Sequence, residues 1–244
     1  MVEFLLIFAG LVAGFIDSIA GGGGLITLPV LSLYLMPGPH SIGTNKIVGT
    51  VGALTALIIY ARKGHLQLGK GMSFVLLVGA GSFLGSSCAP YLPVDYFKIL
   101  LIILCPLLLL VVWNKDKFIH EDLEHKITPW IFISTGILSG FYDGFFGPAG
   151  GTFMLLGLLY AVKLPLFVAL AISKLANTLS AGVALATYAS GGFVHWKVGL
   201  LMTAGMAVGA FFGAHLANKK ANQIVKPVLT LIVCLLIVKL IFNL

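Results

Sequence analysis

Charged residues are scarce in this sequence. They make up 9% of the 244 residues, whereas hydrophobic residues make up 59%, and the mean hydropathy is +1.07. A soluble domain carries roughly 25% charged residues, so this chain lacks the charges that cover a water-facing surface. No soluble domain remains once the apolar runs are removed. The shortage excludes a soluble globular protein and predicts a polytopic helical membrane protein.

Cysteines and acidic residues are also few. The 3 cysteines show no C-x-x-C spacing, and no Cys/His or paired-acid pattern is present, so we expect no disulfide framework, metal site, cofactor or enzyme activity. The net charge is +7, but the basic residues lie scattered between apolar runs, which argues against a nucleic-acid partner. The first residues have no basic n-region and no cleavage motif, so we expect no removable signal peptide.

A glycine-rich break occurs twice in the chain. Residues 14–24 read GFIDSIAGGGG, and residues 140–151 read GFYDGFFGPAGG. Glycine runs interrupt helices. The apolar segment before the first break, 4–16, reaches only about 20 Å of the roughly 30 Å bilayer core, and 25–36 after it is also short. We expect a re-entrant hairpin or a split helix at each break; two short but complete spans remain the alternative.

The second half of the sequence repeats the plan of the first. Lys46 matches Lys174, Tyr60 matches Tyr188, and GSFLG at 81–85 matches GAFFG at 209–213. We predict an all-α membrane protein of two inverted-topology repeats, each with a glycine-broken element and three spanning helices. The first repeat covers 1–113, a cytoplasmic linker 114–127, and the second repeat 128–244.

The distribution of Lys and Arg predicts the inversion. Loop 62–70 holds three of them and its counterpart 191–197 holds one, whereas loop 89–97 holds none and its counterpart 217–226 holds three. By the positive-inside rule, loops 62–70 and 217–226 and the linker are cytoplasmic, and both termini are outside. Each half then crosses the membrane an odd number of times, as inverted transporter repeats do.

Two lysines are the main candidates for an anion site. Lys46 and Lys174 each follow a short polar turn, where we expect a helix to begin; snorkelling to the membrane interface is the other interpretation. Hydroxyl and amide groups beside them, helix N-termini and glycine N–H groups would together bind an anion. The expected substrate-binding residues are Lys46, Lys174, Asn45, Thr44, Thr50, Ser173, Asn177, Thr178, Gly22, Gly23 and Gly150.

The matched acids Asp17 and Asp143 have two interpretations. Each precedes a glycine break, where an aspartate caps the following helix or pairs with a lysine. An acid in an apolar segment is otherwise costly and marks proton pathways, so direct proton coupling is the alternative. The glycines themselves lack the preceding strand and the Gly-Lys-Ser/Thr ending of a phosphate-binding loop.

These motifs resemble a known family. G-x-x-D before a glycine run, then a turn and T-N-K or T-S-K, repeated in the second half, resembles the sulfite exporter TauE/SafE family of bacterial and archaeal transporters, over residues 3–242. The family usually has T-S-K at both lysines, whereas this chain has T-N-K and I-S-K. The resemblance implies transport of small sulfur-containing anions or organosulfonates across a prokaryotic plasma membrane, driven by an ion gradient.

We therefore expect a secondary transporter of a small anion that works by alternating access, with its site between the halves near the midplane. An anion channel of the same architecture and a non-transporting scaffold subunit remain open. The expected partners are the anion and the lipid bilayer; a coupling ion (proton or sodium) and a homo-oligomer are left open.

Overall fold

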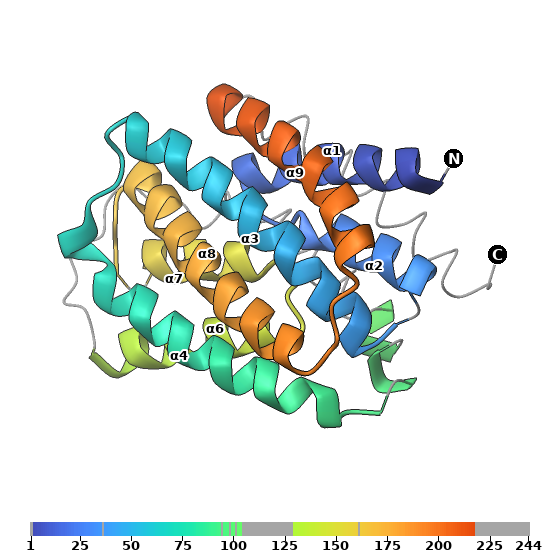
Figure 1. Cartoon of the computed structure of the whole chain (residues 1–244). Coiled ribbons are helices and arrows are strands. Elements are labelled where there is room, and N and C mark those ends of the chain that lie inside the picture. Colours follow the sequence, from blue (N-terminus) through green and yellow to red (C-terminus); the bar gives the residue numbers. More distant parts are fainter. Residues whose placement is uncertain are drawn as a thin grey trace.

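Helices make up every regular element in the part of the chain that this computed structural model describes, residues 2–35, 37–93, 95–97, 99–100, 102–103, 129–160 and 162–217 (Figure 1). They are α1 (Val2–Ala20), α2 (Gly24–Leu35), α3 (Pro39–Arg62), α4 (Met72–Cys88), α6 (Pro129–Phe145), α7 (Gly150–Tyr160), α8 (Leu166–Ser190) and α9 (Trp196–Leu216), with 3-10 turns at Leu68–Lys70 and Ala89–Tyr91. The predicted linker 114–127, span 227–242 and most of span 97–113 lie outside the described residues.

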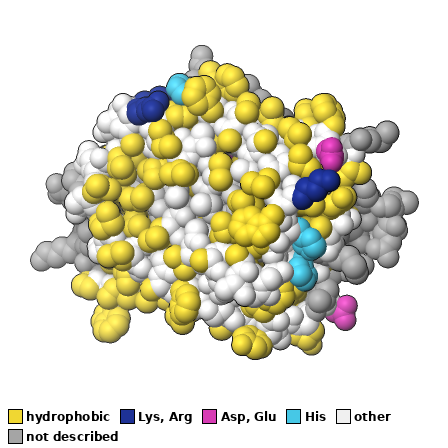
Figure 2. Space-filling model, in the orientation of Figure 1, with side chains coloured by type: hydrophobic (Ala, Val, Ile, Leu, Met, Phe, Trp, Pro, Cys, Tyr) yellow, Lys and Arg dark blue, Asp and Glu magenta, His cyan; other side chains and the backbone are white. Residues whose placement is uncertain are grey.

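Five helices of the described part, α1, α3, α4, α8 and α9, are long and apolar enough to cross a membrane. Their outer surfaces are apolar as well: Figure 2 shows hydrophobic side chains spread over one face, with the few charged and histidine side chains toward its margin. Phe4, Leu76, Trp130 and Leu200 are among the exposed large side chains. Such a surface is the one that lipid solvates.

The first helix is longer than expected. The sequence predicts a half-length segment at 4–16, but α1 has 19 residues, about 28 Å, and its last turn includes Asp17. It ends at Ala20 because Gly21 and Gly22 take φ of 73° and 93°. Each glycine element is thus a long helix followed by a short one, since α2 has 12 residues and α7 has 11.

The two halves interlock. The most extensive helix contact joins α1 to α9, and the next joins α6 to α4, the corresponding elements of the other half. In the middle α3 packs against α8, with α9 beside α3 and α4 beside α8 (Figure 1). Each contact therefore has a counterpart in which every helix is replaced by the corresponding helix of the other half.

Glycine contacts show which way the helices run. Gly10 lies against Met202 and Gly14 against Met206, so α1 and α9 are parallel. By the same comparison α4 is parallel to α6 and to α8, α3 is parallel to α9, and α3 is antiparallel to α8. Each of α1, α3 and α4 thus points opposite to its counterpart α6, α8 or α9. Which end faces the cytoplasm stays a prediction.

Candidate functional site

A small polar cavity lies where the glycine breaks of the two halves meet. It leaves ≈ 30 Å³ for the centre of a water-sized sphere. A buried water needs roughly 10–15 Å³ on this measure, so the cavity holds a few small molecules of that size at most. Its lining residues are Asp17, Gly22, Gly24, Thr27, Asn45, Lys46, Gly49, Asp143, Gly147, Ala149, Gly150, Gly151, Asn177, Ala181 and Met206.

The two breaks form one side of this cavity because they touch each other. A Cβ added at Gly24 would lie 3.0 Å from the Cα of Pro148, so the α1–α2 turn and the α6–α7 turn are in backbone contact. In the second turn Gly147 and Ala149 take φ of 104° and 59°, and an alanine in this region is strained. Helices α2 and α7 begin here, so the positive ends of both helix dipoles face the cavity.

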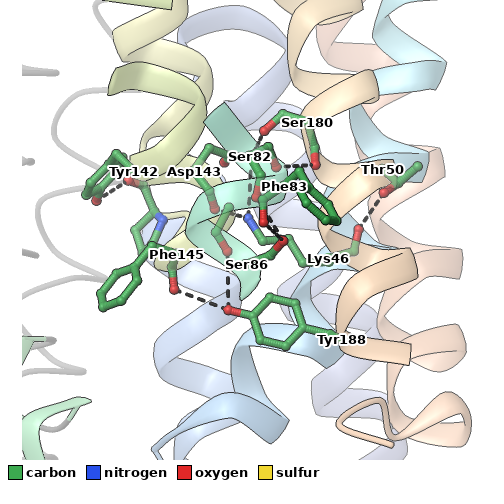
Figure 3. A network of polar contacts seen from close by, with 12 residues as sticks. Lys46, Thr50, Ser82, Phe83, Ser86, Tyr142, Asp143, Phe145, Ser180 and Tyr188 are labelled. Carbon is green, nitrogen blue, oxygen red and sulfur yellow. Dashed lines mark hydrogen bonds and ion pairs between the residues drawn. The ribbon is translucent and has the colours of Figure 1, made fainter. Parts of the chain in front are cut away.

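Lys46 of the first half pairs with Asp143 of the second (Figure 3). Its Nζ lies 3.3 Å from Oδ2 of Asp143 and donates a hydrogen bond to the backbone carbonyl of the same residue. Ser180 of α8 donates to that Oδ2 at 2.6 Å. The lysine and aspartate side chains are 3% and 5% exposed, so water does little to weaken their attraction.

Lys174 of the second half pairs in the same crosswise manner with Asp17 of the first. Its Nζ lies 2.7 Å from Oδ2 and donates to the backbone carbonyl of Asp17 at 2.6 Å. The N–H of Gly23 donates to the other carboxylate oxygen at 3.1 Å. Asp17 therefore both accepts the backbone N–H of the residue just before α2 and serves as the counter-ion of Lys174. The four charges around the cavity cancel in this form.

Comparison of the sequence with known proteins identifies its family. The sequence model described as "Sulfite exporter TauE/SafE" matches residues 6–240. This chain belongs to the sulfite exporter TauE/SafE family. It is a transport protein rather than an enzyme, a multi-pass membrane protein of a prokaryote that works in a lipid bilayer on a small substrate.

Curated relatives of this TauE/SafE protein carry similar names. It is 37% identical to the probable membrane transporter protein ORF9 of Sinorhizobium sp, over 98% of this chain and 92% of that protein. It is 34% identical to a probable membrane transporter protein of Haemophilus influenzae, over 98% and 94%, and 32% identical to the probable membrane transporter protein YfcA of Escherichia coli K12, over 98% and 89%. No solved structure matches the chain.

Some of the predicted site residues line the cavity of this family member. The structure brings together Lys46, Asn45, Asn177, Gly22 and Gly150, and places Asp17 and Asp143 with them. Lys174 is not in the lining; its Nζ is bound to Asp17, which is in it. Gly23 is not in it either; its N–H serves the same acid.

Four predicted hydroxyl residues use their oxygen elsewhere. Thr50 donates to the Lys46 carbonyl and Thr178 to the Lys174 carbonyl, both at 2.7 Å, and Ser173 donates to the Leu170 carbonyl. Thr44 accepts the N–H of His195, at the start of α9. Hydroxyls inside a helix commonly bond their own preceding turn, so their presence beside the lysines did not place them in the cavity.

The expected helix starts at the lysines are wrong. Helix α3 begins at Pro39 and α8 begins at Leu166 after Pro165, so Lys46 and Lys174 lie about two turns inside their helices. Proline favours the first helical position because its fixed φ suits the helix and it has no N–H to satisfy. The helix N-termini at the cavity are therefore those of α2 and α7.

Several lining residues escaped the sequence argument. Gly49 and Ala181 stand four positions after Asn45 and Asn177, on the same helix faces, and this spacing would have found them. Thr27 donates to the side-chain oxygen of Asn45 at 2.6 Å and has no match in the second repeat. Nothing in the sequence marks Met206 as a lining residue.

Proposed function

We propose that this protein is a secondary transporter of a small anion, a sulfur-containing oxyanion or an organosulfonate, and that it works by alternating access. The family description, sulfite exporter, supports the substrate class. The observation that carries the proposal is the crosswise pairing of Lys46 with Asp143 and of Lys174 with Asp17 beside a small polar cavity. Burying a charged side chain within a membrane costs free energy, and a scaffold without transport activity has no use for such charges.

The cavity has the groups that an anion needs. Among the described residues, Lys46 is the one buried lysine in the cavity lining. The N-termini of α2 and α7 also face the cavity. Glycines leave backbone N–H groups accessible at close range. In this structure the ammonium of Lys46 is paired with the Asp143 carboxylate. A substrate anion therefore has to replace that carboxylate as the partner of Lys46.

The cavity is too small for the proposed substrate, which supports a conformation in which the binding site is not accessible to it. A volume of ≈ 30 Å³ suits water rather than a sulfonate, so the substrate enters only after the surrounding helices have moved. Both ion pairs join one half of the chain to the other. Relative movement of the elements that carry them would open the cavity and break the pairs together, as alternating access requires.

Binding and uptake measurements test the proposal. Purified protein is screened by thermal shift against sulfite, thiosulfate, sulfate and methanesulfonate, and vesicles containing it are tested for gradient-driven uptake of the same anions. We expect Lys46→Ala and Lys174→Ala to abolish uptake. Lys197→Ala is the matched control, because that lysine is 85% exposed, and it should transport normally. Normal uptake by both buried-lysine variants would refute the site, and uncoupled flux in the wild type would indicate a channel.

A further inference from the structure

The two cavity acids differ in the kind of group that binds them. Asp17 is bound by the ammonium of Lys174 and the N–H of Gly23. Asp143 is bound by the ammonium of Lys46 and the hydroxyl of Ser180. Ammonium and backbone N–H groups only donate hydrogen bonds, whereas a hydroxyl both donates and accepts. The equivalent acids of the repeat are therefore not chemically equivalent.

This difference decides which acid can hold a proton. A proton on either oxygen of Asp17 would face a donor, because each oxygen already accepts one: Oδ1 from Gly23 and Oδ2 from Lys174. A protonated Asp143 can donate to Ser180, whose hydroxyl then rotates to bond the preceding turn of its own helix. The lysine contact is also longer, 3.3 Å to Asp143 against 2.7 Å to Asp17.

The asymmetry originates in the sequence. Ser180 lies six residues after Lys174, and the position six residues after Lys46 is Gly52, which has no hydroxyl. The space where a side chain of Gly52 would lie holds Met206 instead. Position 52 therefore offers Asp17 no hydroxyl like the one that Ser180 offers Asp143.

We propose that Asp143 is the proton-binding acid of the transport site, and that its protonation releases Lys46 to bind the substrate anion, whereas Asp17 stays ionised and structural. This inference rests on the proposed function and assigns the coupling ion. With both acids ionised the site is neutral, and a buried anion would add an uncompensated charge. One proton on Asp143 leaves Lys46 unbalanced, and one monovalent anion restores neutrality. Proton and anion then occupy the site together and cross in the same direction.

The other titratable groups around Asp143 allow this change. Lys46 on α3 contacts it directly, Tyr188 on α8 donates to the carbonyls of Gly144 and Phe145 next to it, and Asp17, paired with Lys174, lies across the cavity. Helices α4 and α7, which also pack against α6, contain no Asp, Glu, Lys, Arg or His. The charge on Lys46 is thus the one that protonation of Asp143 exposes.

Infrared titration of the full chain in lipid vesicles tests the assignment without a substrate. Acidification should produce the carbonyl band of a buried protonated carboxyl in the wild type and in Asp17→Asn, and the band should be missing from Asp143→Asn. Ser180→Ala should change the midpoint of this band, and Ser180→Thr, which keeps the hydroxyl, should restore it. Persistence of the band in Asp143→Asn, or its loss in Asp17→Asn, would overturn the proposal; an unchanged midpoint in Ser180→Ala would do so as well.

Vesicle transport separates this inference from the proposed function. Methanesulfonate is the probe, because it carries a single negative charge and does not itself exchange protons near neutral pH. We expect a more acidic exterior to drive uptake in the wild type, and Asp143→Asn to lose this accumulation while still exchanging internal for external methanesulfonate. Accumulation by Asp143→Asn, or uptake driven by an alkaline exterior, would contradict the coupling. If no anion of the panel moves, the proposed function fails, and the infrared comparison still decides which acid binds the proton.

Discussion

Replacing Lys174 by Met tests whether the crosswise pairs stabilise the fold. The substitution keeps a long apolar side chain and removes the ammonium that lies 2.7 Å from Asp17 Oδ2. At an effective dielectric constant of 20 two charges at that distance attract each other by roughly 6 kcal/mol, most of which offsets the cost of taking both out of water. The variant leaves a buried carboxylate without its counter-ion, and we expect it to lower the free energy of unfolding by about 3–5 kcal/mol.

A second substitution shows whether the loss comes from the stranded charge. In Lys174→Met/Asp17→Asn the acid is neutral, and the amide oxygen still accepts the N–H of Gly23. We expect the double variant to be more stable than Lys174→Met alone. Lys197→Met is the control, because Lys197 and Glu3 form an exposed pair that contributes little.

The measurement is a double-mutant cycle on purified protein in mild detergent, with unfolding followed during a denaturant titration. The cycle gives the coupling between Lys174 and Asp17 directly. If the stability losses of Lys174→Met and Asp17→Asn add up to the loss of the double variant within about 0.5 kcal/mol, the two residues do not interact. The crosswise pairing would then be wrong.

Two further predictions concern packing and orientation. In Gly209→Val the new side chain would meet the backbone of Leu11, so α1 and α9 must separate, at a cost of about 1–3 kcal/mol seen as a lower unfolding temperature. Gly182→Ala is its control, because an added Cβ there meets nothing within 4 Å, and it should gain up to about 1 kcal/mol; equal effects of the two would refute the close packing. Reporter fusions should place loop 63–71 in the cytoplasm and loop 191–195 outside, because they follow the antiparallel helices α3 and α8, and a shared location would contradict the inverted topology.

The sequence predicts the glycine breaks well but not the length of the helix before the first one. The expected segment ends at residue 16 because an aspartate interrupts the apolar run. In the structure α1 continues through Asp17, since Lys174 neutralises that acid and the break comes only where Gly21 and Gly22 take positive φ. A charged residue that is neutralised by a partner far along the chain does not end a helix. The hydropathy of a single segment carries no information about such a partner.

The four charged residues at the cavity are predictable from the sequence, but their pairing is not. Matching the repeats identifies Lys46, Lys174, Asp17 and Asp143, yet nothing in the sequence says that each lysine selects the acid of the opposite half. That choice follows from packing, because α3 and α8 run antiparallel in the middle and carry each lysine to the far glycine break. The sequence predicts side chains such as Thr50 in the site because their hydroxyls could bind an anion. In the structure that hydroxyl bonds a carbonyl of its own helix and does not line the cavity.

The interlocked packing restricts which parts can move as rigid bodies. Helix α1 is held against α9, and α6 against α4, through glycine contacts in which added side chains would overlap backbone atoms. Both of these tight pairs combine one helix from each half of the sequence, so the halves cannot rock apart without disrupting them. The boundary between α3 and α8 has fewer such overlaps: an added Cβ at Gly49 would be 3.9 Å from the Cβ of Ala181, and one meets the Cβ of Tyr188 at 2.9 Å only near the helix end, at Gly43. If transport proceeds by the proposed alternating access, a movement that preserves the glycine contacts would shift α1, α3 and α9 against α4, α6 and α8. Lys46 and Asp143 lie on opposite sides of that boundary, as do Lys174 and Asp17, so the proposed movement would separate each lysine from its acid as it opened the cavity.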